Sequence, residues 1–153
     1  MQTRSYEIVK EPAGDAYRAV LSLLETSGAE AGLVISQDGV ETGALSLAVI
    51  DVLKSVIVDV RKVTEWPGTK LQDGQSARLL RFEIVPTSIE LLRMRADRLY
   101  GWRLPDLPAD LCAWRADGSL LMGTIAHQRD GWLVLTEEEA ERLRGFVDLR
   151  ASR

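Results

Sequence analysis

Cysteine and histidine are nearly absent from this sequence, which has one residue of each, Cys112 and His127. A single cysteine cannot form an internal disulfide, and a zinc site usually takes three or four ligands drawn mainly from these two residue types. We therefore assign no disulfide, no metal and no cofactor. The stability of the protein must come from packing of its core.

Long apolar runs, phosphate-binding loops and an excess of basic charge are also lacking. No apolar run approaches the roughly 20 residues that span a bilayer, and residues 1–7 lack the apolar core of a signal peptide. No glycine-rich phosphate loop or dinucleotide fingerprint occurs. The net charge of -4 gives no overall attraction to nucleic acid or to anionic lipid. These absences favour a cytoplasmic protein and argue against nucleic-acid and membrane partners.

What is present is the material of an ordinary globular domain. The 153 residues, 46% of them apolar, suffice for one domain with a substantial core. Alternating or β-branched runs predict strands over residues 5–9, 33–36, 56–63, 80–84, 111–114, 120–126 and 132–135. The intervening helical periodicity predicts one α+β domain over residues 1–153, with about four helices packed against one mixed, mostly antiparallel sheet.

Capping residues predict where three of the helices begin. Thr42 can cap the second helix, which should give way to a strand near Lys54 and Ser55. Thr87 to Glu90 forms a capping box for the third helix, which we expect to end at Gly101. Thr136 to Glu139 repeats the capping box for the last helix.

Two turns have a clear sequence signature. In Trp66-Pro67-Gly68-Thr69, proline presets the first central angle and glycine supplies the positive φ of a type II turn. Asp117-Gly118 lies between two apolar runs and predicts a β-hairpin.

Only one set of residues offers nucleophilic catalysis. Cys112 or Ser119 would act with His127 as the base and Asp130 as its orienting group. The alternative is that Cys112 is a buried strand thiol and that Ser119 belongs to the hairpin turn. The alternative is favoured, because a residue set without demonstrated geometry is weak evidence for an enzyme.

Tryptophan is the more informative residue type. Trp66, Trp102 and Trp132 stand at the edges of predicted elements and not inside periodic apolar stripes. Such indoles either seal the core under a loop or line a recognition surface, and the sequence leaves both open. With their polar neighbours they define the predicted binding residues, which are Glu65, Trp66, Lys70, Trp102, Asp110, His127, Asp130 and Trp132.

Several ordered motifs carry a family resemblance. They are Glu65-Trp-Pro-Gly-Thr-Lys-Leu71, Leu99-Tyr-Gly-Trp102, Leu107-Pro-Ala-Asp-Leu-Cys112, Arg115-Ala-Asp-Gly-Ser119 and Ile125-Ala-His-Gln-Arg-Asp130. In these motifs the chain resembles a family of small bacterial proteins of unknown function, some of which carry the label stage III sporulation protein AH. The resemblance covers roughly residues 65–135 and implies no established activity.

These observations lead to three hypotheses about function. The first is a non-catalytic module that binds another macromolecule, with a protein as its partner, in an immunity-type or regulatory role. The second is a small-molecule site or enzyme between the Trp66-Pro67-Gly68 turn and the His127 loop, which requires both to lie at the same end of the sheet. The third is nucleic-acid binding through the arginines from Arg93 to Arg103, and a solvated helix face is favoured over it.

Overall fold

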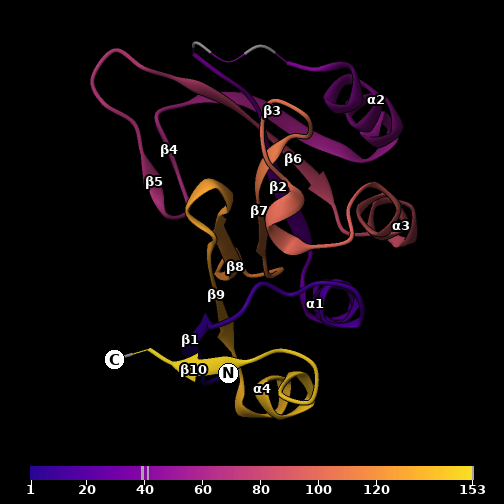
Figure 1. Ribbon diagram of the computed structural model, residues 1–153, viewed down its shortest axis with the longest axis vertical. Helices are drawn as coiled ribbons and strands as arrows, with labels where there is room; N and C mark the ends of the chain where they lie inside the picture. Colours follow the sequence, from indigo (N-terminus) through magenta and orange to yellow (C-terminus); the bar gives the residue numbers. More distant parts are fainter. Residues whose placement is uncertain (39, 41, 153) are drawn as a thin grey trace.

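A single antiparallel sheet of eight strands runs through the protein (Figure 1). The structure is a computed structural model, and it describes residues 1–38, 40 and 42–152. Its strands, in spatial order, are β10 (Leu149–Ala151), β1 (Arg4–Ile8), β9 (Asp130–Leu135), β8 (Leu120–Ile125), β7 (Ala109–Trp114), β2 (Glu30–Gln37), β6 (Ala77–Glu83) and β3 (Ile57–Val63). The short strands β4 (Glu65–Trp66) and β5 (Thr69–Lys70) form a separate hairpin.

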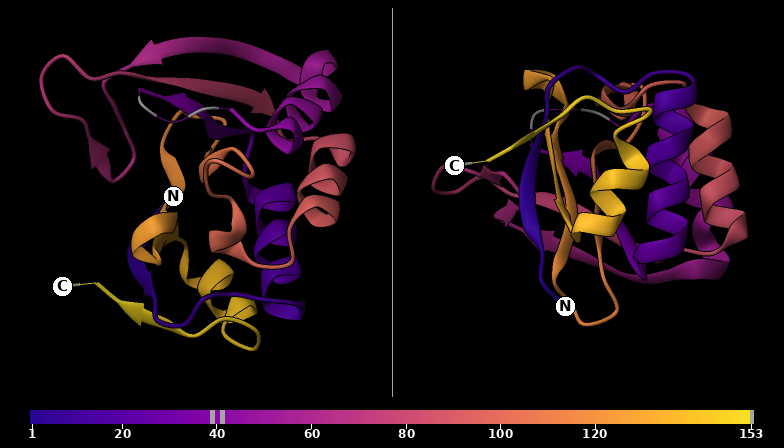
Figure 2. Two further views of the ribbon diagram at one scale, coloured as in Figure 1. Left: turned by 45° about the horizontal axis from the view of Figure 1, so that its top comes forward. Right: turned by 90° about the horizontal axis from the view of Figure 1, so that it is seen from below.

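Four α-helices and three short 3₁₀ turns connect these strands. The helices are α1 (Asp15–Ser27), α2 (Ala44–Leu53), α3 (Pro86–Arg95) and α4 (Glu137–Leu143), and the 3₁₀ turns are η1 (Lys54–Val56), η2 (Leu99–Gly101) and η3 (Ala126–Gln128). Helices α1, α3 and α4 lie side by side on one face of the sheet (Figure 2). The α+β class and the mostly antiparallel sheet are therefore confirmed.

The main core lies between the helices and the sheet, and Trp102 is at its centre. The indole of Trp102 has no exposed surface, and its Nε1 donates a hydrogen bond of 2.9 Å to the hydroxyl of Tyr17 on α1. That hydroxyl donates in turn to the carbonyl of Leu92 on α3, at 2.6 Å. One buried polar chain thus connects two helices to the segment that leads into β7, and burial raises the pKa of Tyr17.

The opposite face of the sheet has a smaller apolar cluster, formed by Val34, Trp66, Ala77 and Leu79. No helix supplies this cover. The hairpin β4–β5 does so instead, because Trp66 packs onto side chains that β2 and β6 project away from the helices. Both faces of the central strands are therefore buried, which explains why β2 is apolar along most of its length.

Most of the predicted elements are confirmed, including two specific junctions. The chain leaves α2 at η1 and enters β3 at Ile57, so the break near Lys54 and Ser55 is confirmed. The Asp117-Gly118 turn joins β7 to β8, with Gly118 at φ 86°. The capping box of α4 is also present, because Glu139 N donates to Thr136 Oγ1 and Thr136 N donates to a Glu139 carboxylate oxygen.

Two of the predicted caps are wrong, because in each case a different hydrogen bond forms at the start of the helix. Thr42 does not cap α2, which begins after Gly43, because the Thr42 hydroxyl donates to the carbonyl of Ile35. In α3 the helix begins at Pro86, so the cap is not Thr87; the hydroxyl of Ser88 accepts a hydrogen bond from the amide of Val85.

The predicted end of α3 is also wrong. The helix ends at Arg95 and not at Gly101, because the segment after it is drawn toward the start of α1. The amide of Leu99 donates to the carbonyl of Pro12, and the amide of Gly14 donates to the carbonyl of Asp97. The strand β10 was not predicted, because three residues are too few to show alternation.

In the described part of the chain, no helix combines the length and the hydrophobicity that crossing a bilayer requires.

Two tyrosines provide a matched test of this core. The Tyr17 hydroxyl both donates and accepts, whereas the buried hydroxyl of Tyr100 has no hydrogen-bond partner among the described residues. We expect Tyr17→Phe to lower the free energy of unfolding by about 2 kcal/mol, because it leaves two buried groups without partners. Tyr100→Phe should leave it unchanged or raise it by up to about 1 kcal/mol. Urea unfolding followed by circular dichroism measures both, and equal losses would contradict the assignment.

Candidate functional site

The corner where the β4–β5 hairpin meets the end of β8 contains most of the predicted binding residues. Asp110 joins the two segments through its carboxylate, which accepts a hydrogen bond from Trp66 Nε1 and another from the amide of Ala126, each at 2.9 Å. The side chain of Asp110 is buried, with 4% of the residue exposed. We call this region, from Trp66 to Trp132 through Asp110, the Trp66 corner.

Backbone conformation explains which residues occupy the Trp66 corner. Asp110 has φ 57°, in the left-handed region where aspartate and asparagine are tolerated better than most residues. Gly68 has φ 84°, as a type II turn requires, and a Cβ there would lie 2.5 Å from the ring of Trp132. A Cβ on Gly123, opposite Trp132 in the sheet, would lie 2.3 Å from the same ring. Two glycines thus make the space for one indole.

Seven of the eight predicted binding residues lie at the Trp66 corner, in two groups, and the eighth lies elsewhere. Trp66 and Asp110 are buried and Trp132 is half-buried, and these three hold the corner together. Glu65, Lys70, His127 and Asp130 are exposed around its rim, and Glu65 lies opposite Lys70 in the backbone register of the hairpin.

Trp102 does not belong to the Trp66 corner. Its placement with the other predicted residues has to be corrected, because a fully buried indole on the helical side of the sheet offers no surface to a partner. The sequence showed only that Trp102 stands at the edge of an element. That place in the chain does not determine toward which face of the sheet the indole turns.

The geometry excludes the one nucleophile set that the sequence offers. Cys112 is 1% exposed, and burial raises the pKa of its thiol to about 12. Ser119 precedes β8 and His127 follows it, so a six-residue strand places about 20 Å between them. The Ser119 hydroxyl donates to the carboxylate of Asp117 in the hairpin turn. Among the described residues, no group of three or more His, Cys, Asp or Glu side chains could hold a metal.

Two of the four arginines from Arg93 to Arg103 are paired with neighbouring acidic residues. Arg93 pairs with Glu90 at 2.8 Å, and Arg98 lies near both Asp97 and Glu11. A nucleic-acid interface needs cationic groups that are free to meet phosphates. These ion pairs therefore favour the solvated-face interpretation of the region.

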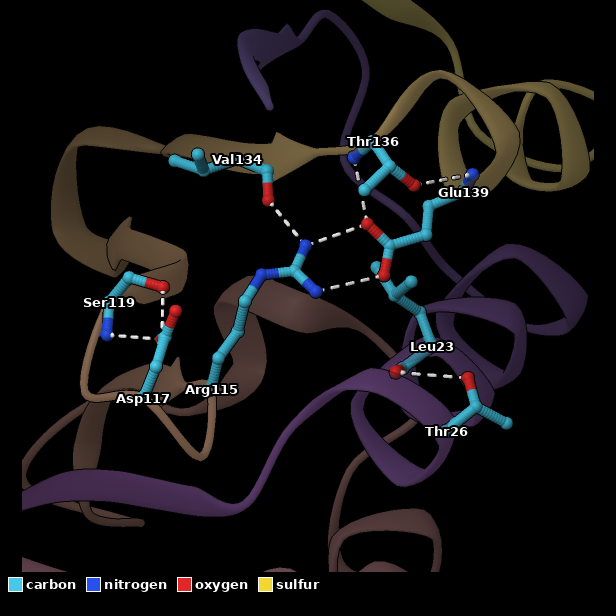
Figure 3. Close-up of polar contacts among 8 residues, drawn as sticks. All are labelled: Leu23, Thr26, Arg115, Asp117, Ser119, Val134, Thr136 and Glu139. Carbon is cyan, nitrogen blue, oxygen red and sulfur yellow. Dashed lines mark hydrogen bonds and ion pairs between the residues drawn. The ribbon is translucent and has the colours of Figure 1, made fainter. Parts of the chain in front are cut away.

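A buried ion pair lies between the β7–β8 turn and α4 (Figure 3). The guanidinium of Arg115 donates to both carboxylate oxygens of Glu139, at 2.6 and 3.0 Å, and also to the carbonyl of Val134 at 2.9 Å. Burial by itself would raise the pKa of Glu139. The hydrogen bonds, chiefly those from Arg115, outweigh it and lower the pKa to about 2.

An open groove of about 420 Å³ between α1 and α4 lies beside this pair and includes Glu139 in its lining. Leu23, Leu143 and Phe146 provide most of its apolar wall. Its acidic groups already have partners, since Glu139 pairs with Arg115 and Asp15 pairs with Arg18. The groove therefore presents no buried polar group that still needs a ligand.

Exposed apolar side chains gather at a different place, on α2 and the strand that follows it. Ten large apolar residues are exposed in the described part of the chain, and six of them lie between residues 40 and 60. Three belong to α2, where Leu45, Leu47 and Val52 are 52%, 58% and 43% exposed. We call these three side chains the α2 surface.

Comparison with family models, with curated proteins and with solved structures finds no match for this chain. The family resemblance of residues 65–135 therefore stays a prediction, and the function has to be argued from geometry.

The Asp110 contact predicts a clear loss of stability on substitution. Asp110→Ala should lower the free energy of unfolding by about 3 kcal/mol, because two buried donors lose their acceptor and alanine is strained at positive φ. Asp110→Asn, which tolerates that φ and keeps one acceptor oxygen, should lose roughly half as much. Chemical unfolding measures both values. The exposed Asp106→Ala is the control, and a comparable loss there would show that the effect is not specific.

The Arg115–Glu139 pair predicts how stability depends on pH. Because the folded-state pKa of Glu139 is lowered to about 2, its contribution is fully present above the unfolded value of about 4.3 and is lost as the pH falls toward 2. The loss is on the order of 3 kcal/mol. Glu139→Gln should flatten the unfolding free energy between pH 5 and 3, measured with urea, whereas the exposed neighbour Glu137→Gln should not. An unchanged pH slope in Glu139→Gln would refute this role.

Proposed function

We propose that this protein is a non-catalytic protein-binding module, in an immunity-type or regulatory role, and that it binds its partner through the α2 surface. The concentration of exposed apolar side chains on α2 is the observation that carries the proposal. Apolar side chains that are exposed together can mark a site that binds another macromolecule. Leu45 and Val52, seven residues apart, share one side of α2, and Leu47 is exposed on another side of the same helix.

The composition of α2 supports this assignment. Of its ten residues, Ala44 to Leu53, only Asp51 is charged. A helix that packs on its own sheet and meets water on its other side normally alternates apolar and polar faces. Ser46, Val49 and Leu53 form the buried face of α2, yet Leu45, Leu47 and Val52 point outward. Covering these three with a partner protein would remove the large exposed apolar side chains of α2 from water.

The Trp66 corner supports the alternative function less well. The Trp66 turn and the His127 loop do meet, which is the geometry that a small-molecule site or enzyme there requires. However, the buried polar groups of Trp66 and Asp110 bond to one another and to the backbone, so they are not available to a ligand. The exposed rim fits the polar border of a protein–protein interface better than a catalytic set. Its residues are Glu65, Lys70, His127 and Asp130.

The test compares retention of a partner by matched variants. Immobilised wild-type protein should retain a protein from bacterial lysate at near-physiological salt, and Leu45→Ser with Leu47→Ser should reduce that retention at least about tenfold. Met94→Ser, which changes a still more exposed apolar residue on α3, is the control and should retain the partner. Circular dichroism verifies that each variant is folded. Equal retention by all three proteins, or none by the wild type, would contradict the proposal.

A further inference from the structure

The two edges of the eight-stranded sheet differ sharply. One edge is β10, which has only three residues. The other is β3, which has seven residues and pairs with β6 on one side. On its outer side, no backbone hydrogen bond reaches β3 from the described residues. A long unpaired edge is a template for another strand, and proteins usually block or use it.

The surroundings of β3 favour its use. Val58 and Val60 on the strand are 46% and 37% exposed, and η1 joins the strand directly to α2. The bulge that often protects an edge lies between Ile57 and Asp59, at the start of the strand. From Asp59 to Val63 the pairing with β6 is regular, so this part of the edge is free to accept a strand along its length.

The charges on β3 specify which strand would fit. Asp59 and Arg61 lie two residues apart and so on the same face, opposite Arg81 and Leu79 of β6. If two copies of β3 pair antiparallel about a two-fold axis at Val60, Asp59 of each copy lies opposite Arg61 of the other. Moving the axis to Asp59 or to Arg61 places like charges directly opposite, which is destabilising. In this register the regularly paired residues Asp59, Val60 and Arg61 of one copy lie opposite Arg61, Val60 and Asp59 of the other, and the bulged start of each strand faces Lys62 and Val63.

We propose that two copies of this chain associate through β3, antiparallel and two-fold about Val60, to form one continuous sheet. The existing Asp59–Arg61 ion pair of 2.9 Å within each copy becomes part of a cluster of four alternating charges. A two-fold interface of this kind uses the same surface on both copies, as closed dimers do. With the axis normal to the sheet, both sets of helices lie on one face.

Charge exchange tests this pairing. The wild-type protein should sediment as a dimer in analytical ultracentrifugation. Asp59→Arg and Arg61→Asp should each dimerise at least about tenfold more weakly, because two opposite-charge contacts become two like-charge contacts. An equimolar mixture of the two variants should recover a dimer, since each contact between positions 59 and 61 then joins a basic residue of one copy to an acidic residue of the other. Native mass spectrometry should identify that dimer as the mixed species.

The mixture separates pairing between copies from effects within one copy. Neither single variant regains its own ion pair on mixing, so recovery requires contact between the two chains. Arg150→Asp on β10 is the control, since it changes an exposed edge charge on the opposite edge and should leave the dimer intact. A monomeric wild type, unweakened single variants or a mixture that stays monomeric would each overturn the inference. The partner retained through the α2 surface is measured separately and does not depend on this result.

Discussion

The hydrogen bonds to the carboxylate of Asp110 hold the side of the sheet that the helices do not cover. This carboxylate accepts hydrogen bonds from the Trp66 indole, on the β4–β5 hairpin, and from the amide of Ala126, where β8 ends. The hairpin has only two strands of two residues each and could not hold its position through its own ladder. Once the hairpin is held, Trp66 covers the apolar cluster on the sheet face that the helices leave open.

Three buried polar contacts are made within the chain, and they limit where function can reside. Trp66 bonds to Asp110, Trp102 bonds to Tyr17, and Arg115 bonds to Glu139. Groups that are already paired have no reason to bind a ligand, because any new contact would first have to break a buried one. The apolar residues that remain exposed therefore carry more functional information here than the polar ones. Five of the ten that are exposed in the described part of the chain lie on α2 and β3, which are joined by η1.

Local signals in the sequence were reliable where the chain itself supplies both halves of an interaction. The Trp66–Thr69 turn, the Asp117–Gly118 hairpin and the Thr136 capping box each use residues at most three apart, and each is present. The Thr87 capping box is just as local but did not form, because the bond between Val85 and Ser88 starts α3 one residue earlier. Thr42 does not cap α2, because its hydroxyl donates to the carbonyl of Ile35, seven residues before it. A capping residue competes among all the partners that the folded chain brings to it.

The candidate site divides along the same line. The sequence alone determined the α+β class and the order of most elements, because both rest on periodicity and on turn chemistry. It also showed that unusual residues gather around Trp66, Asp110 and His127. Only the tertiary structure decided that Trp66 and Trp132 meet at one corner while Trp102 lies on the other side of the sheet. It also decided that α2 keeps apolar side chains in water and that β3 is an unpaired edge. Burial and strand order are properties of how distant segments pack, and no local pattern contains them.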